Sequence, residues 1–295
     1  MRVLLAGLIV PFAVGSPSVA AKLDGFSKPC GSAMSGKFLY LDSYGTGVLS
    51  RIDPATNRVV KRAKIAVGPC GIVAGAGALW VEDYYQNAIL RVNPATMKVT
   101  NRIFVGRKPW DVAFAFGSAW ATNSGATVSR ISAKTRKVVK TIAIRGGGSP
   151  TCIRSGAGAI WVGLQGSDNI ARIDPLTNRA TTIPIGHGSE LCVDAHDDGI
   201  WVSDDVAGTV THLDPGGKVL ATVKAGTKPS DGTRGPDGLE WIPNVGDGTI
   251  TRIDPATDKV VDTIPVVAAP FVARTAFGSV WVGDFAGSQL WRITP

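Results

Sequence analysis

A ten-residue segment, RIDPATNRVV at residues 51–60, recurs along the chain at nearly constant spacing. Related segments begin at Arg91, Arg130, Arg172, His212 and Arg252, and a shortened RITP begins at Arg292. Successive copies start 40, 39, 42, 40, 40 and 40 residues apart. A period of this size that carries strand patterns is typical of the blades of a β-propeller. The sequence therefore predicts seven equivalent units.

Each period reads as four short strands. In the second unit these are PCGIVAG, ALWVED, AILRVNP and KVTNRIFV, which show period-two alternation and many β-branched residues. In the repeated segment, Pro sets the φ angle of a turn and the preceding Asp or Asn can accept hydrogen bonds from the turn backbone. We expect this segment to be the hairpin between the two outer strands. The predicted fold is all-β, a seven-bladed propeller with four antiparallel strands per blade.

An aromatic residue marks the same place in every unit. The positions are Tyr40, Trp80, Trp120, Trp161, Trp201, Trp241 and Trp281. Since the residue recurs in every unit, we assign these side chains to packing between adjacent blades. The last unit ends after its third strand, so we expect residues near AKLDGF, from Ala21, to add the fourth strand and close the ring.

The chain begins with the features of an export signal. Arg2 precedes the apolar run VLLAGLIVPFAVG, and SVAA offers small residues for cleavage. The run is shorter than the roughly 20 residues of a membrane-spanning helix, and Pro11 interrupts it. We predict a cleaved signal peptide over residues 1–21 and a propeller over residues 22–295. The product is expected to be a monomer, periplasmic or secreted, with no membrane span after cleavage.

The four cysteines form two pairs, each separated by 40 residues. Cys30 and Cys70 follow the Pro that opens the inner strand of units one and two, and Cys152 and Cys192 occupy similar places in units four and five. Equal heights on neighbouring inner strands bring cysteines within reach of a disulfide. We predict the disulfides Cys30–Cys70 and Cys152–Cys192. Inert free thiols are the alternative; no Cys or His spacing is typical of a metal site.

Basic and aromatic residues gather at one predicted face of the ring. Three lysines directly precede the Pro of their inner strands, namely Lys28, Lys108 and Lys228, and we expect them to form a positive rim together with Trp110 and Tyr84. The formal charge of +8 favours anionic partners without identifying one.

A second set of polar residues is predicted deeper in the channel. When each unit is aligned on its Trp, Arg154, Asp194, Arg234 and Arg274 fall at one level. Three guanidinium groups could bind a carboxylate or a phosphate with paired hydrogen bonds. The alternative is that Asp194 neutralises a neighbouring Arg and water fills the channel.

Acidic residues end the second strands. They are Asp42, Glu82, Asp83, Asp204, Asp205 and Asp284. Carboxylates around a ring can hold Ca²⁺ or Mg²⁺, but Asp at such places more often caps turns. We favour the turn role and predict no metal or cofactor.

The segment GALWVEDYYQNAILRVNPATMKVTNRIFVGRKPWDVAFAFG resembles the repeat of the YncE-like and YVTN-type bacterial seven-bladed propellers, which overlap in sequence with streptogramin (virginiamycin B) lyases. The resemblance covers the mature chain and implies the fold more strongly than a function. For a member of the lyases, the resemblance would imply an axial site with Glu ligands for Mg²⁺ and a His that acts as the base. Here only Glu82 approximates that pattern, so the elimination apparatus does not carry over.

Two classes of function follow. The first is an exported binding or scaffold propeller that presents a basic funnel and axial channel to an anionic small molecule, a polymer or a protein. The alternative is a metal-assisted lyase or hydrolase acting on a lactone or ester, with Mg²⁺ or Ca²⁺ held by Glu82 and Asp204 or Asp284. A quinone-dependent dehydrogenase is a more distant option. Nucleic acid is not expected, because the predicted face lacks the interleaved basic and aromatic residues of a strand-binding groove.

Overall fold

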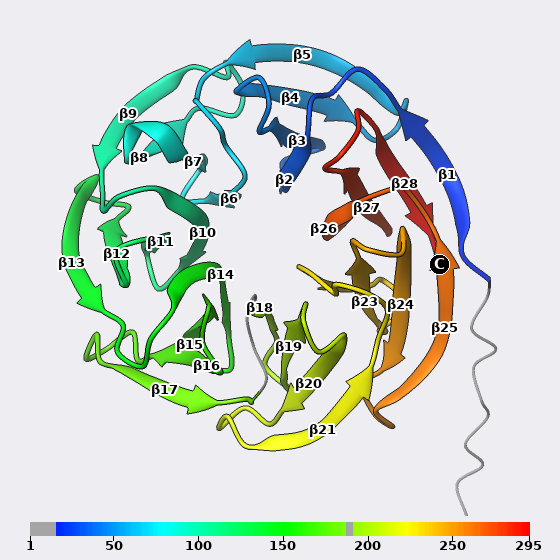
Figure 1. The fold of residues 1–295 in the computed structure, drawn as a ribbon. Coiled ribbons are helices and arrows are strands. Elements are labelled where there is room, and N and C mark those ends of the chain that lie inside the picture. Colours follow the sequence, from blue (N-terminus) through cyan, green and yellow to red (C-terminus); the bar gives the residue numbers. More distant parts are fainter. Residues whose placement is uncertain (1–15, 187–190) are drawn as a thin grey trace, which may run out of the picture.

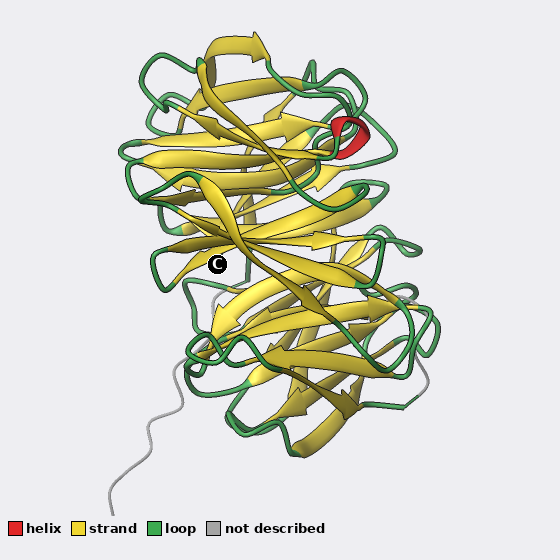
Figure 2. Cartoon of the chain, turned by 90° about the vertical axis from the view of Figure 1, so that its left-hand side faces the viewer, coloured by secondary structure: helices red, strands yellow, loops and turns green. Residues whose placement is uncertain are grey.

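The computed structural model describes residues 16–186 and 191–295, and this part of the chain forms a closed ring of blades around a central axis (Figure 1). It contains seven antiparallel sheets of four strands. In six of them the strands are consecutive in sequence from the axis outward, and in the seventh the outermost strand is the N-terminal one. The one helix among these residues is the 3₁₀ turn η1 (Tyr84–Gln86). Figure 2 shows the molecule from the side, with the connecting loops at the two faces of the ring. The predicted seven-bladed propeller is confirmed.

The blades follow the sequence repeat. Blade one contains β2 (Pro29–Ser35), β3 (Phe38–Ser43), β4 (Val48–Asp53) and β5 (Arg58–Lys64). Blade two contains β6 (Ile72–Gly75), β7 (Ala78–Asp83), β8 (Ala88–Val92) and β9 (Val99–Phe104). Blade three contains β10 (Pro109–Ala115), β11 (Ser118–Asn123), β12 (Thr127–Ser132) and β13 (Lys137–Ala143). Blade four contains β14 (Ser149–Gly156), β15 (Ala159–Gln165), β16 (Asn169–Ile173) and β17 (Ala180–Pro184).

The other three blades have the same plan. Blade five contains β18 (Leu191–Ala195), β19 (Ile200–Asp204), β20 (Thr209–Leu213) and β21 (Val219–Lys224). Blade six contains β22 (Thr233–Arg234), β23 (Glu240–Asn244), β24 (Thr249–Asp254) and β25 (Lys259–Pro265). Blade seven contains β26 (Pro270–Ala276), β27 (Ser279–Asp284), β28 (Leu290–Thr294) and the N-terminal strand β1 (Ser18–Leu23).

The ring is closed by pairing the two ends of the described chain. β1 runs antiparallel to β28, from Ser18 opposite Thr294 to Leu23 opposite Leu290. This confirms the predicted closure. The strand begins four residues before Lys22, so cleavage after Ala21 would leave only its last two residues in the mature chain. The signal peptide itself lies mostly outside the described residues and stays a prediction.

The recurrent aromatic residues form the contacts between blades, as expected. All six repeat tryptophans and Tyr40 are at most 1% exposed. Each packs against apolar residues of the next blade: Trp120, for example, lies in a cluster with Ile153 and Ile160, and Trp161 lies in a cluster with Val193. Aromatic side chains bury about 150–250 Å² each, so these seven positions supply much of the apolar contact that holds the ring together.

The repeated decapeptide forms the hairpin between the two outer strands, and it also joins neighbouring blades. Arg292 in blade seven donates to the carbonyl oxygen of Pro54 at 2.6 Å and to Oδ1 of Asn57 at 3.0 Å, both in the hairpin of blade one. Arg130 makes the same two bonds to Pro175 and Asn178 in the next blade. Asn57 and Asn178 have φ angles of 53° and 58°, a left-handed conformation that Asn tolerates better than most residues. The repeat therefore carries both the turn and its docking contact.

Both predicted disulfides are present. Cys30 is bonded to Cys70 and Cys152 to Cys192, and each bond crosses 40 residues to join adjacent blades near the axis.

Candidate functional site

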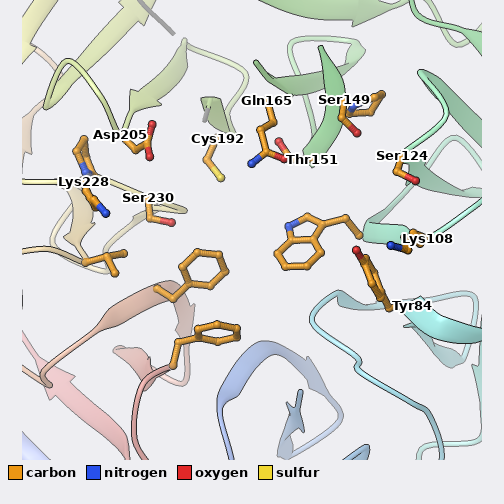
Figure 3. Close-up of a pocket in the computed structure, with 16 residues that line it drawn as sticks. Tyr84, Lys108, Ser124, Ser149, Thr151, Gln165, Cys192, Asp205, Lys228 and Ser230 are labelled. Carbon is orange, nitrogen blue, oxygen red and sulfur yellow. The ribbon is translucent and has the colours of Figure 1, made fainter. Parts of the chain in front are cut away.

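Two cavities lie at opposite ends of the propeller axis. The funnel cavity, of about 470 Å³, lies where the inner strands begin (Figure 3). Its lining includes Tyr84, Lys108, Trp110, Lys228, Phe271 and Phe285. The lower cavity, of about 370 Å³, lies nearer to the hairpins where the inner strands end, and its lining includes Ala113, Arg154, Asp194, Thr233 and Arg274.

A single layer of residues separates the two cavities. Ser230 lines the funnel cavity and Gly232 lines the lower cavity, with Asp231 between them. Asp111 of β10 and Cys152 of β14 occupy the same intermediate position on their strands. Asp111, Asp231 and Cys152 therefore lie at a level between the two cavities.

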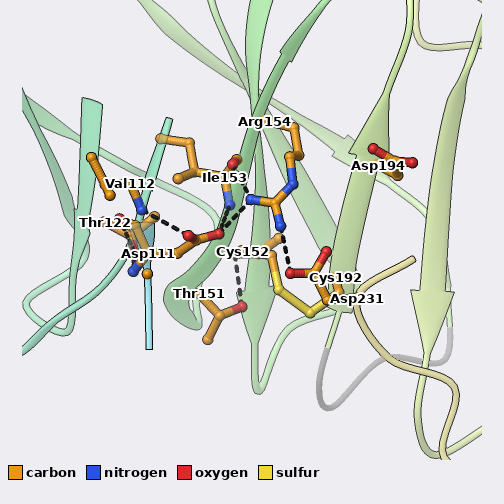
Figure 4. Close-up of polar contacts among 12 residues, drawn as sticks. Asp111, Val112, Thr122, Thr151, Cys152, Ile153, Arg154, Cys192, Asp194 and Asp231 are labelled. Atoms are coloured by element: carbon orange, nitrogen blue, oxygen red, sulfur yellow. Dashed lines mark hydrogen bonds and ion pairs between the residues drawn. A yellow bond between two sulfur atoms is a disulfide. The ribbon is translucent and has the colours of Figure 1, made fainter. Parts of the chain in front are cut away.

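This layer holds an ion-pair network that spans several blades (Figure 4). The guanidinium of Arg154 donates to Asp111 Oδ2 at 2.6 Å and also contacts Asp231 Oδ2. Arg274 donates to the same oxygen of Asp231 at 2.6 Å. The network therefore contains two guanidinium and two carboxylate groups. Burial alone would lower the pKa of Arg154, but the charges of Asp111 and Asp231 outweigh it and raise that pKa.

The expected anion site at this level is largely neutralised by the protein's own carboxylates. Burial raises the pKa of Asp231, although the charge of Arg154 lowers it. We considered Asp194 as the partner of a neighbouring arginine. Its Oδ2 instead lies 3.0 Å from Nε2 of His196. Neither Asp111 nor Asp231 was predicted to take part. The sequence did offer one signal: both stand two residues after the Pro of their inner strand, where four of the other units have Gly or Cys.

Arg234 does not lie at the predicted level. In the other blades, the repeat aromatic residue lies opposite the residue seven places before it on the neighbouring strand. Arg154 lies opposite Trp161 in this way, and Arg274 lies opposite Trp281. In blade six Thr233 pairs with Trp241 and Arg234 pairs with Glu240. This shift of one residue reverses the side on which Arg234 lies. Its guanidinium contacts Glu240 and Asp198 instead of joining Arg154 and Arg274.

Four of the five predicted rim residues line the funnel cavity. These are Tyr84, Lys108, Trp110 and Lys228. The fifth, Lys28, has its Nζ 6.0 Å from the ring of Phe285, which does line the cavity. Lys108 Nζ lies 5.7 Å from the ring of Tyr84.

The three lysines share an unusual backbone conformation. Lys28, Lys108 and Lys228 have φ angles of 51°, 44° and 55°, and each directly precedes a proline. Gly68 has the corresponding position in blade two, with φ 70°. A left-handed conformation costs a residue with a Cβ atom about 1–2 kcal/mol, a cost that glycine avoids. Lysine therefore has, in three blades, a conformation that glycine adopts without this cost.

Aromatic side chains form a continuous arc at this cavity. Ring centroids are 4.8 Å apart for Phe271 and Phe285, 5.7 Å for Phe285 and Tyr44, and 5.7 Å for Tyr84 and Trp110. Tyr44 bridges the two halves, 6.4 Å from Tyr84. Burial and the hydrogen bond to Tyr85 raise the pKa of Tyr44, which keeps its phenol protonated. Sequence reasoning missed Tyr44, Phe271 and Phe285, although Phe271 follows its Pro as Trp110 does.

The acidic ends of the second strands bind the backbone, as we favoured. Asp42 accepts from the N–H of Gly31, Glu82 from those of Cys70 and Gly71, Asp204 from those of Val206 and Ala207, and Asp284 from that of Ala269. Burial raises the pKa values of Asp42 and Glu82 well above their ordinary range. One oxygen of each carboxyl group therefore supports its own loop, while Asp42 Oδ2, Glu82 Oε2 and Asp204 Oδ2 are buried without a hydrogen-bond partner among the described residues.

A different group has the composition of a metal site. Asp194, His196 and Glu240 each offer one ligand atom, and these atoms lie within 4.8 Å of one another. Burial would lower the pKa of His196, but the hydrogen bonds and charges of Asp194 and Glu240 raise it to about 10. The sequence predicted no metal site, and we placed neither His196 nor Glu240 in one.

Comparisons with known proteins show the fold. No protein-family model matches the chain, and no curated protein matches its sequence. A Staphylococcus aureus virginiamycin B lyase structure aligns with TM-score 0.84 and 16% identity, covering 95% of this chain and 100% of that one. A Kuenenia stuttgartiensis hydrazine synthase structure aligns with TM-score 0.80 and 17% identity, covering 90% and 96%. At such identities only the fold is shared, so the YncE and YVTN assignment stays a prediction.

Two observations bear on the compartment. The two disulfides indicate an oxidising, extracytoplasmic environment. Residues 16–186 and 191–295 contain no helix with the length and hydropathy of a membrane span.

Proposed function

We propose that this chain is an exported, non-enzymatic binding propeller, periplasmic or secreted, whose funnel cavity takes an anionic small molecule with an apolar or aromatic part. The observation that carries the proposal is the placement of Lys108 and Lys228 around a cavity that also has four aromatic side chains, several hydroxyl groups and one carboxylate, Asp205, in its lining (Figure 3). A volume of about 470 Å³ is in the range of small-molecule sites. A cavity of this size favours a small molecule over the polymer or protein considered from the sequence.

The charges of the two cavities support the choice of the funnel. Arg154 and Arg274 already have carboxylate partners, so an anion at their level would have to displace Asp111 or Asp231. Among the described residues, Lys28 and Lys108 form no ion pair, and their ammonium groups lie near the rings of Phe285 and Tyr84. An anionic ligand would supply the missing charge while its apolar part contacts the aromatic arc.

The test uses a pair of probes that differ only in charge, 2-naphthoate and the neutral 2-naphthamide. Both are titrated into the full propeller by calorimetry at low and high salt. We expect naphthoate to bind more tightly and its affinity to fall with salt. Since a hydrogen bond to a charged group contributes about 1.5–3 kcal/mol, Lys108→Met or Lys228→Met should weaken naphthoate about 10- to 100-fold and leave the amide unchanged.

Lys98→Met, an exposed lysine of an outer turn, is the matched control for net charge. Equal affinity for the two probes, or equal effects of Lys98→Met and Lys108→Met, would refute the proposal.

The alternative, a metal-assisted lyase or hydrolase, is supported by likeness in fold to the virginiamycin B lyase. We place it second because Glu82, Asp204 and Asp284, the carboxylates proposed for its metal, bind backbone N–H groups of their own loops.

A further inference from the structure

We propose that Asp194, His196 and Glu240 form a binding site for a divalent transition-metal ion, with Zn²⁺ as the best fit. The site lies at the hairpins of blades five and six, beside the lower cavity and away from the funnel cavity. It does not depend on the function proposed above.

Two of the three distances between the ligand atoms are close to those around a tetrahedral ion, and all three lie within 4.8 Å. His196 Nε2 lies 3.0 Å from Asp194 Oδ2 and 3.4 Å from Glu240 Oε1. Zinc binds nitrogen and carboxylate oxygen at about 2.0–2.2 Å, so two tetrahedral ligands lie about 3.4 Å apart. The three side chains therefore need little movement to enclose an ion.

Glu240 occupies a position that is apolar in every other blade. It directly precedes the repeat aromatic residue, where the other six units have Leu39, Leu79, Ala119, Ile160, Ile200 and Val280. Its side chain is fully buried, and Oε2 has no hydrogen-bond partner among the described residues. Burying a carboxylate with an unpaired oxygen is costly. Packing alone would place an apolar residue here. Arg234 and His196 contact only Oε1 of Glu240, so Oε2 remains for a further partner.

The charges around the site leave room for a dication. Asp194, Glu240 and Asp198 each bring one negative charge, and Arg234 brings one positive charge through its contacts with Glu240 and Asp198. A metal ion would have to displace the proton that His196 carries at neutral pH. With His196 then neutral, the group has a formal charge of −2, which one divalent ion neutralises. Arg234 also orients the Glu240 carboxylate, as outer-shell groups do in metal sites.

The ligand set selects the kind of ion. An imidazole nitrogen favours Zn²⁺ and its first-row neighbours over Ca²⁺ and Mg²⁺, which prefer all-oxygen sites. Three protein ligands leave a fourth position open. The Asp194 side chain lines the lower cavity, and that of His196 is 25% exposed, so water or a small ligand can reach this position.

The experiment uses the full propeller without an affinity tag, stripped with EDTA and dialysed. ZnCl₂ is titrated by calorimetry, and CoCl₂ is followed by visible absorption, which reports coordination directly. We expect one ion per chain and an intense tetrahedral cobalt spectrum. His196→Ala and Glu240→Gln should each weaken Zn²⁺ by more than about 100-fold, since losing an outer-shell partner alone costs about 10- to 100-fold.

His212→Gln is the control. His212 Nδ1 also lies 2.7 Å from a carboxylate oxygen, Asp258 Oδ1, but among the described residues it belongs to no group of three potential metal ligands. It should bind like the wild type. Glu240→Leu restores the apolar residue of the other blades and should remain folded by circular dichroism while losing the metal. Failure of the folded wild type to bind one Zn²⁺, or equal binding by His196→Ala, would overturn the proposal.

Discussion

Removing either disulfide should destabilise the propeller by about the same amount. Both bonds close loops of the same length, because Cys30 and Cys70 are 40 residues apart and so are Cys152 and Cys192. In the chain-entropy model, a 40-residue loop corresponds to about 4 kcal/mol at 25 °C. The paired variants Cys30→Ala/Cys70→Ala and Cys152→Ala/Cys192→Ala should therefore each lose about 4 kcal/mol of unfolding free energy. Alanine is chosen because it leaves no buried hydroxyl.

The two bonds should also act independently. One joins blades one and two and the other joins blades four and five, so the quadruple variant should lose about the sum of both effects. That loss, about 8 kcal/mol, is comparable with the total stability of many domains. We expect the quadruple variant to be unfolded or close to unfolding at 37 °C.

Urea denaturation followed by tryptophan fluorescence measures both quantities. The midpoint should fall in each paired variant, and the slope of free energy against urea should rise, because an uncrosslinked denatured chain exposes more surface. Mass spectrometry of the alkylated wild type should find no free thiol. A loss below about 1 kcal/mol, or a difference above about 2 kcal/mol between the two paired variants, would refute the loop-length reasoning.

Three further predictions concern other parts of the ring. Trp161→Ala empties a fully buried position between blades four and five and should cost about 3–5 kcal/mol in the same urea assay. Arg292→Met removes the bonds to Pro54 and Asn57 that join blade seven to blade one; it should cost about 2 kcal/mol and lower the thermal midpoint. Burial raises the pKa of Glu82 in the folded state above its ordinary 4.5, so its contribution to stability is fully present below pH 4.5 and is lost as the pH rises. Glu82→Gln should therefore reduce the fall in the urea midpoint with rising pH, and an unchanged pH profile would contradict this assignment.

The sequence predicted those features that depend on contacts between equivalent positions of adjacent blades. Cys30 and Cys70 are one period apart, so their proximity follows from the repeat alone, and the same reasoning places Trp120 against blade four. The rim lysines were found in the same way, since each precedes the Pro of its inner strand. For residues at equivalent positions, the alignment of the repeats alone shows which residue of one blade lies beside which residue of the next.

Contacts across the axis could not be predicted in this way. Arg154 of blade four contacts Asp231, which leads into blade six, so this pair skips a blade. It depends on side-chain length and on which residues face each other across the channel, and the period does not encode either. The sequence therefore indicated the charges of the channel but not that they cancel.

Blade six shows how one local irregularity changes a site. The segment TRGPDGLEW brings Thr233 opposite Trp241, whereas an unshifted register would have placed Arg234 there. Asp237 in this hairpin accepts from Trp241 Nε1 at 2.9 Å, a bond that backbone carbonyls such as those of Gly156 and Ala276 provide for other repeat tryptophans. With Arg234 thus turned away from the channel, it contacts Glu240 and allows a carboxylate at a core position beside His196. The same shift that made the predicted arginine ring wrong therefore builds the candidate metal site.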